Sequence, residues 1–120
     1  MAYTAYVLTK ESRDKLLDSF PPVYENVIAH HITVVFGIPK NTHPPKKPKT
    51  VQVIGYINDG EGVEGLLVSV NGNTNRDDGS KYHITMSLAN GRKAVETNNY
   101  VNDVTKIHPI TIDVIPKTLD

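Results

Sequence analysis

Two nearly identical tetrapeptides decide the fold: H-I-T-V at residues 31–34 and H-I-T-M at residues 83–86. Each belongs to an apolar stretch with the composition of a β-strand, and one lies in each half of the chain. Because side chains alternate between the two faces of a strand, the histidine and the threonine of each motif share one face, and the apolar residues share the other. The repeat predicts a diverged duplication, in which residues 1–49 and 50–120 form two β/α lobes on either side of a central cleft.

The segments around the two motifs predict further strands and two helices. In the first half we expect a strand at 3–8, a helix at 11–20 capped by Thr9, a strand at 29–37 and a connector rich in proline and lysine at 38–49. In the second half we expect strands at 50–59, 63–71, 81–88 and 106–115, a polar loop at 71–80, and a short helix at 92–100 capped by Asn90. This order predicts an α+β fold of one domain, 1–120, with two mostly antiparallel sheets around the cleft and helices on the outside.

The composition excludes several classes of protein. There are 13 basic and 13 acidic residues among 120, so the formal net charge is +0, which argues against holding nucleic acid by bulk positive charge. The absence of cysteine excludes disulfides, thiolate catalysis and cysteine-ligated metals. The histidines lack metal-ligand spacing, so we expect no metal and no cofactor. No apolar run approaches the roughly 20 residues of a membrane span, and the first residues do not resemble a signal peptide. We therefore expect a cytoplasmic protein without membrane association or an obligate protein partner.

The two motifs together suit chemistry at phosphorus. A cleft between the lobes would hold two imidazoles and two hydroxyls in near-mirror positions. With an ordinary pKa of about 6.5, two histidines can act as a base and an acid near neutral pH. Two threonine hydroxyls can donate hydrogen bonds to the non-bridging oxygens of a phosphate. The alternative is that threonine is simply common in strands and that each histidine is a half-buried filler.

At these motifs the chain resembles the 2H phosphoesterase superfamily. That superfamily includes LigT-like RNA phosphodiesterases, the cyclic phosphodiesterase domains of fungal and plant tRNA ligases, and phage proteins that destroy cyclic nucleotide immune signals. The resemblance implies a duplicated bilobal fold, with His31 and His83 as the catalytic histidines and Thr33 and Thr85 as the phosphate-binding hydroxyls. It also implies a metal-independent phosphodiesterase that acts on a 2′,3′-cyclic phosphate, including that of an RNA end, or on a cyclic nucleotide or oligonucleotide. Only the two tetrapeptides carry the resemblance, so the substrate stays open.

Two further residues are candidates for substrate binding. Tyr6 could face the cleft and stack on a base, or it could be a half-buried structural residue; Tyr3 is the second choice for the same role. Lys81 shares a face with His83 and could hold a second phosphate, or it could be the solvated end of a strand.

Two other residues are not assigned to the site. Arg76, in the polar loop, is within possible reach of a phosphate but is not selected. His30 should point to the opposite face from His31, so its removal is expected to leave activity nearly intact. Besides an enzyme, the motifs fit a non-catalytic nucleotide-binding module on the same fold, or a structural domain in which the repeat is accidental.

Overall fold

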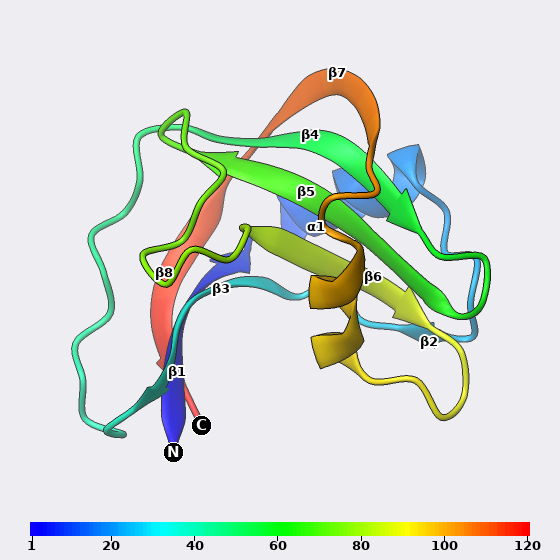
Figure 1. The fold of residues 1–120 in the computed structure, drawn as a ribbon. Helices are drawn as coiled ribbons and strands as arrows, with labels where there is room; N and C mark the ends of the chain where they lie inside the picture. Colours follow the sequence, from blue (N-terminus) through cyan, green and yellow to red (C-terminus); the bar gives the residue numbers. More distant parts are fainter.

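Eight strands and two short helices make up residues 1–120, all of which are described by the computed structural model (Figure 1). In chain order the elements are β1 (Ala2–Leu8), α1 (Lys10–Ser19), β2 (Asn26–Val27), β3 (His31–Ile38), β4 (Val51–Asn58), β5 (Val63–Val70), β6 (His83–Leu88), the 3₁₀ helix η1 (Ala94–Tyr100), β7 (Thr105–Ile112) and β8 (Val114–Leu119). The α+β class, dominated by antiparallel strands, agrees with the sequence prediction. Neither helix has the length and hydropathy needed to cross a membrane.

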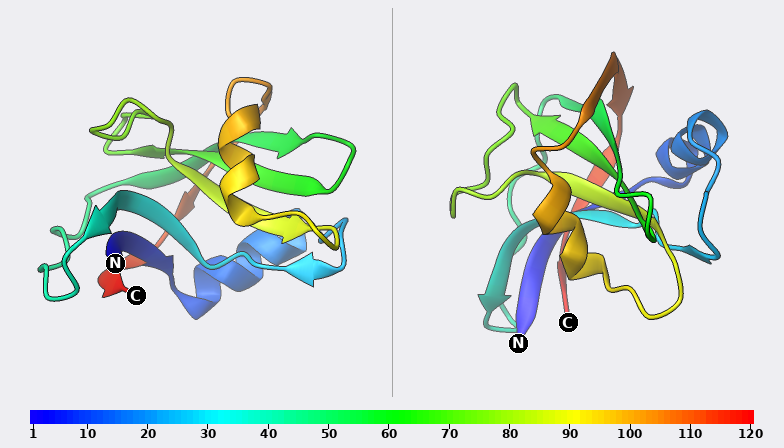
Figure 2. Two further views of the ribbon diagram at one scale, coloured as in Figure 1. Left: turned by 60° about the horizontal axis from the view of Figure 1, so that its bottom comes forward. Right: turned by 45° about the vertical axis from the view of Figure 1, so that its right-hand side comes forward.

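All the strands belong to one curled sheet, in the order β7-β4-β5-β6-β3-β1-β8, with the short β2 also paired to β6 (Figures 1 and 2). The two motif strands, β3 and β6, are neighbours, but only Ile32 and Ile84 pair across them. The prediction of two separate sheets therefore differs from the structure. Pairing the strands into one sheet covers edges that separate sheets would leave open.

The halves 1–49 and 50–120 are also not the spatial halves of the molecule. β8, from the C-terminal half, pairs with β1, and β2, from the N-terminal half, pairs with β6. The strand expected at 106–115 breaks at Asp113, whose N–H donates to Ser12 Oγ at 2.7 Å. The chain therefore leaves β7 beside β4, at one end of the sheet, and enters β8 beside β1 at the other. Within β7, Pro109 falls where the register with β4 is interrupted, so its missing N–H breaks no ladder bond.

The two helices begin and end for identifiable reasons. Thr9 caps α1 as predicted, its Oγ1 accepting from the Ser12 N–H at 3.2 Å. The second helix starts later than expected and is a 3₁₀ helix. Its cap is Lys93, whose N–H donates to Glu96 Oε2 at 2.5 Å, and not Asn90.

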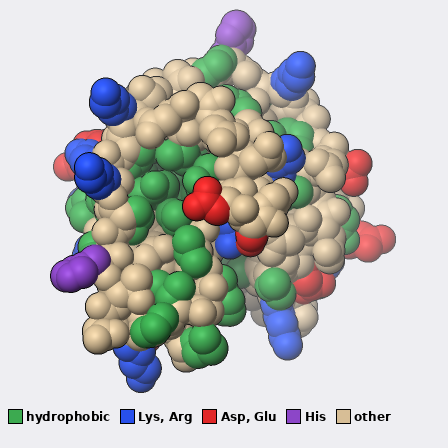
Figure 3. All heavy atoms as spheres, turned by 60° about the vertical axis from the view of Figure 1, so that its left-hand side comes forward, with side chains coloured by type: hydrophobic (Ala, Val, Ile, Leu, Met, Phe, Trp, Pro, Cys, Tyr) green, Lys and Arg blue, Asp and Glu red, His purple; other side chains and the backbone are tan.

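The proline-rich connector after β3 is irregular and mostly exposed, as the sequence predicts. It is tied to β8 by Thr118, whose hydroxyl donates to the carbonyl of Thr42 at 2.6 Å. On the face seen from the connector's side, lysine and arginine side chains are scattered and form no single basic patch (Figure 3).

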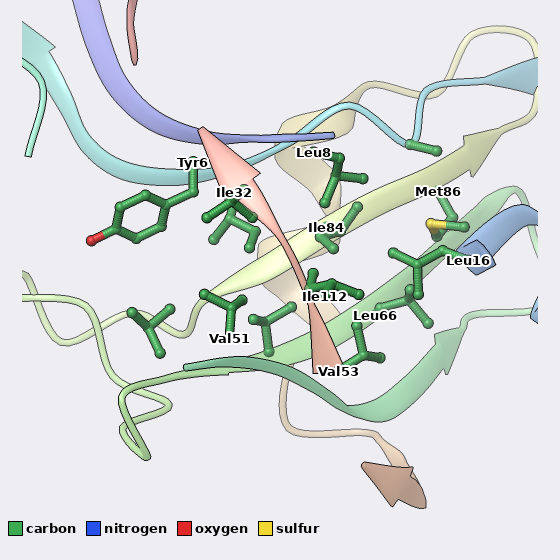
Figure 4. Close-up of a cluster of buried hydrophobic side chains, with 14 residues drawn as sticks. Tyr6, Leu8, Leu16, Ile32, Val51, Val53, Leu66, Ile84, Met86 and Ile112 are labelled. Carbon is green, nitrogen blue, oxygen red and sulfur yellow. The ribbon is translucent and has the colours of Figure 1, made fainter. Parts of the chain in front are cut away.

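The main core lies inside the curl of the sheet, with α1 packed against it through Leu16 (Figure 4). Ile32, Ile84 and Leu16 are fully buried there. Tyr6 is also a core residue, only 6% exposed, so the prediction that it faces the cleft is wrong. It shares a face of β1 with Leu8, and burying that apolar face turns Tyr6 inward.

Candidate functional site

A cavity of about 520 Å³ brings the two motifs together. Strands β1, β3 and β6, the loop before β6 and the helix η1 contribute to it. It is lined by Tyr3, Ile28, His31, Thr33, Phe36, Arg76, Asp78, Ser80, His83, Thr85, Ala94, Val95 and Asn98. All four motif side chains proposed from the sequence thus meet at one place, because each is on the face of its strand opposite the buried isoleucine.

His31 is half-buried and has one polar contact with the protein. Its Nδ1 lies 3.0 Å from Nδ1 of His30, and no protein group bonds its Nε2. Burial, followed by the nearby positive charges that His30 and His83 acquire on protonation, lowers the pKa of His31 to about 4. In the free protein at neutral pH this imidazole is therefore uncharged and can accept a proton.

His83 is held in one tautomer. Its Nδ1 lies 3.0 Å from the carbonyl oxygen of Lys81, which can only accept, so Nδ1 carries a proton and Nε2 is left without a protein partner. Burial lowers the pKa of His83, the hydrogen bond to Lys81 opposes this, and the charge of Arg76 lowers the pKa further.

The two threonines differ in their surroundings. Thr33 is half-buried, and its hydroxyl makes no hydrogen bond within the protein. Thr85 is 8% exposed, and its Oγ1 lies 2.8 Å from Oγ1 of the fully buried Thr97 and 3.4 Å from the carbonyl of Ala94. The hydrogen bond to the Ala94 carbonyl is long and therefore weak. When Thr97 is the donor to Thr85, the Thr85 hydroxyl can give up this weak bond and donate its proton to a ligand instead.

Arg76 is the cationic residue that sequence reasoning did not select. It is 8% exposed, lines the cavity and donates from Nε to the carbonyl of Val34 at 3.2 Å. One Nη lies 3.4 Å from Asp78, a carboxylate that is largely exposed and held by Ser80. The other Nη has no protein partner, so it is available to an anion. The only signal in the sequence was the position of Arg76 in the loop that leads to His83.

One wall of the cavity is apolar. The rings of Tyr3 and Phe36 stack with centroids 5.9 Å apart, and the Tyr3 ring lies 5.3 Å from that of His31. Phe36 is 72% exposed and Val95, on η1, is 67% exposed. The aromatic residue of β1 beside the motifs is therefore Tyr3 and not Tyr6.

Lys81 and His30 also differ from their predictions. Lys81 does not line the cavity; its Nζ donates to Asn75 Oδ1 at 2.6 Å, while its backbone carbonyl binds His83. His30 does not point away from His31 but contacts it. The cause is Ala29, whose φ of 44° is left-handed, so the strand alternation begins only at His31.

A second cavity, between α1 and the connector, is lined by lysines but offers less for catalysis. Lys15 there donates to the carbonyl of Thr111 at 3.1 Å, and Lys47 pairs with Asp113 at 3.2 Å. No three acidic or histidine side chains converge as metal ligands.

Comparisons with protein-family models, with curated proteins and with solved structures found no significant match to this chain.

Proposed function

We propose that this protein is a phosphodiesterase in which two histidines move protons while a phosphate is held in the cavity. The observation that carries the proposal is the convergence of His31, Thr33, His83 and Thr85 on one cavity beside a buried arginine. Two imidazoles, each with a free Nε2, are the groups that a displacement at phosphorus needs for one proton removed and one delivered.

The surroundings of the two histidines support a division of labour. His31 acts as the base, because its pKa of about 4 keeps it unprotonated. His83 acts as the acid: burial lowers its pKa, but the Lys81 carbonyl, by accepting the Nδ1 hydrogen bond, partly offsets that decrease in favour of the imidazolium. The negative charge of a bound phosphodiester would raise the pKa of both imidazoles and help to charge His83.

In the reaction, His31 Nε2 takes a proton from water as the water oxygen bonds to phosphorus. His83 Nε2 gives its proton to the ribose oxygen as the bond from phosphorus to that oxygen breaks. A cyclic phosphate is thereby opened to a phosphate monoester and a free hydroxyl. The same groups would form a cyclic phosphate if a ribose 2′-hydroxyl replaced water as the attacking group.

Arg76 and the threonines would hold the phosphate. The free Nη of Arg76 can donate a charge-assisted hydrogen bond to one of the two non-bridging oxygens of a phosphodiester, and the Thr33 and Thr85 hydroxyls, which line the same cavity, can donate to the other. The apolar wall of Tyr3 and Phe36 suits the base of a nucleotide. We therefore propose a ribose-containing substrate: a 2′,3′-cyclic phosphate, or a cyclic nucleotide or oligonucleotide.

The proposal extends to the origin of the fold. The group β1-β3-β8 and the group β4-β5-β6-β7 each present one motif strand to the cavity, and they meet at the single pair between Ile32 and Ile84. We propose that these groups are the two lobes of a duplicated ancestor, with β2 and β8 exchanged across the junction.

A substrate screen tests the function. Purified protein is incubated with 2′,3′-cyclic mononucleotides, RNA ends carrying a cyclic phosphate, and cyclic di- and trinucleotides, in excess EDTA. The double variant His31→Ala/His83→Ala is the inactive control, and His43→Ala, in the exposed connector, is the matched active control. Turnover that persists in EDTA and is lost in the double variant supports the proposal. Tight binding without turnover by the wild type would instead favour a nucleotide-binding module.

A further inference from the structure

Three hydrogen bonds hold the backbone of His30 and of the preceding Ala29. The N–H of Ala29 donates to the Thr85 carbonyl at 3.0 Å, and the Ala29 carbonyl accepts from Arg13 Nε at 2.9 Å. The His30 carbonyl accepts from the N–H of Leu8 at 2.9 Å. The exposed His30 ring is therefore presented by a rigid, left-handed turn and not by a flexible loop.

The contact between the two rings has a defined geometry. The centroids of His30 and His31 lie 5.2 Å apart with the planes at 80°, and their Nδ1 atoms are 3.0 Å apart. Two nitrogens at this distance share one proton, so one ring donates and the other accepts. The protonation state and the tautomer of the His30 ring thus determine which nitrogen of neutral His31 carries its proton.

Only one of the two arrangements suits a base. When neutral His30 accepts from His31 Nδ1, the lone pair of His31 is on Nε2, the nitrogen that no protein group bonds. When His30 is protonated, its Nδ1 must donate, and the proton of neutral His31 then moves to Nε2. In that state His31 can donate to a substrate but cannot take a proton from it.

We propose that His30 is a positioning residue for His31, holding its ring through the Nδ1–Nδ1 hydrogen bond and selecting the tautomer in which Nε2 accepts a proton. The effect on turnover rests on the proposed function, whereas the coupling between the rings does not. Other titratable or charged side chains lie near this pair. His83, Arg76 and Asp78 line the same cavity, Tyr3 packs against the His31 ring, and Arg13 donates to the Ala29 carbonyl. All of them stay constant in the variants below.

The first test needs no substrate. The histidines are titrated by NMR in the wild type, which has five, and in His30→Ala, His30→Gln and the control His43→Ala, which have four each. The ring carbon and nitrogen shifts are followed. In His30→Ala the pKa of His31 should rise, because the charge that opposes its protonation is gone, and its ring nitrogens should report a changed tautomer balance. His43→Ala should match the wild type. An unchanged titration curve and tautomer for His31 in His30→Ala would overturn the proposal.

The second test is kinetic. His30→Ala should lower kcat by about 10-fold with KM nearly unchanged, the size of effect seen when a residue that orients an active group is removed. His30→Gln retains a hydrogen-bonding partner that does not titrate, so it should recover part of the loss and shift the acid limb of the pH profile. A pH profile identical to the wild type in both variants contradicts the proposal. If the wild type turns over no phosphodiester, the proposed function fails, and the NMR titration still decides the coupling.

Discussion

Arg76 is the residue on which phosphate binding should depend most. Both histidines lining the cavity have a lowered pKa, so in the free protein the guanidinium is the main positive charge near them. Charge-assisted hydrogen bonds are worth about 1.5–3 kcal/mol, so Arg76→Gln should weaken binding of a nucleoside monophosphate roughly 10- to 100-fold. Calorimetric titration measures this, with Lys46→Gln as a control that removes the same charge from the connector. Equal affinities in the two variants would remove Arg76 from the site.

The histidines should act as a unit. His31→Ala or His83→Ala should each reduce turnover by about 10²–10⁴-fold, the usual range for a lost general acid or base. The double variant should be little slower than either single one, because removing one partner already disables the proton transfers. Steady-state rates on the best substrate of the screen decide this. A loss of turnover in the double variant equal to the product of the two single losses would mean that the two imidazoles act in separate steps.

At the scale of elements, η1 can reach the site only because β5 has a glycine beneath it. A Cβ at Gly65 would lie 2.9 Å from the Thr97 methyl group and 3.0 Å from the carbonyl of Ile84. Thr97 in turn holds the hydroxyl of Thr85. Gly65→Ala should therefore destabilise the protein by about 1–3 kcal/mol through overpacking and should also disturb Thr85.

A double-variant cycle separates the clash from other effects of Gly65→Ala. Thr97→Ser removes the methyl group but keeps the hydroxyl, so Gly65→Ala/Thr97→Ser should regain part of the stability lost in Gly65→Ala. Denaturant unfolding of the four proteins gives the coupling energy. Strict additivity of the two substitutions would show that η1 does not press on β5 at this point.

The elements also show where sequence reasoning succeeds. The hairpin of β4 and β5 and the shared faces of His31 with Thr33 and of His83 with Thr85 follow from alternation, which is a local property. The contact of His30 with His31 could not be predicted, because alanine rarely adopts the left-handed conformation seen at Ala29. The role of Tyr3 in place of Tyr6 depends on which face of β1 becomes the core.

At the scale of the whole molecule, the pairing of strands that are distant in the sequence limits what could be predicted from the sequence. β2 has only two residues and no pattern of its own, and it is held as a strand by pairing with β6. The break at Asp113 depends on its contact with Ser12, far away in the sequence. Likewise, Arg76 enters the cavity because its side chain bonds the carbonyl of Val34 in β3. These are tertiary contacts, which local propensity does not encode.

The buried histidines should make the stability of the whole molecule depend on pH. The pKa of His31 is about 4 in the folded state against about 6.5 when unfolded, so between these values the unfolded chain binds more protons. The contribution of His31 to stability should therefore be largest above about pH 6.5 and be lost as the pH drops toward 4, by less than the roughly 3 kcal/mol of a fully buried imidazole, because solvent screens the partly exposed ring. His83, whose pKa is also lowered, acts in the same direction. Denaturant unfolding between pH 4 and 7.5 should show a shallower decline in His31→Gln than in the wild type, and an unaltered one in His43→Ala. A decline of equal steepness in His31→Gln would mean that the imidazole of His31 is not buried in its uncharged form.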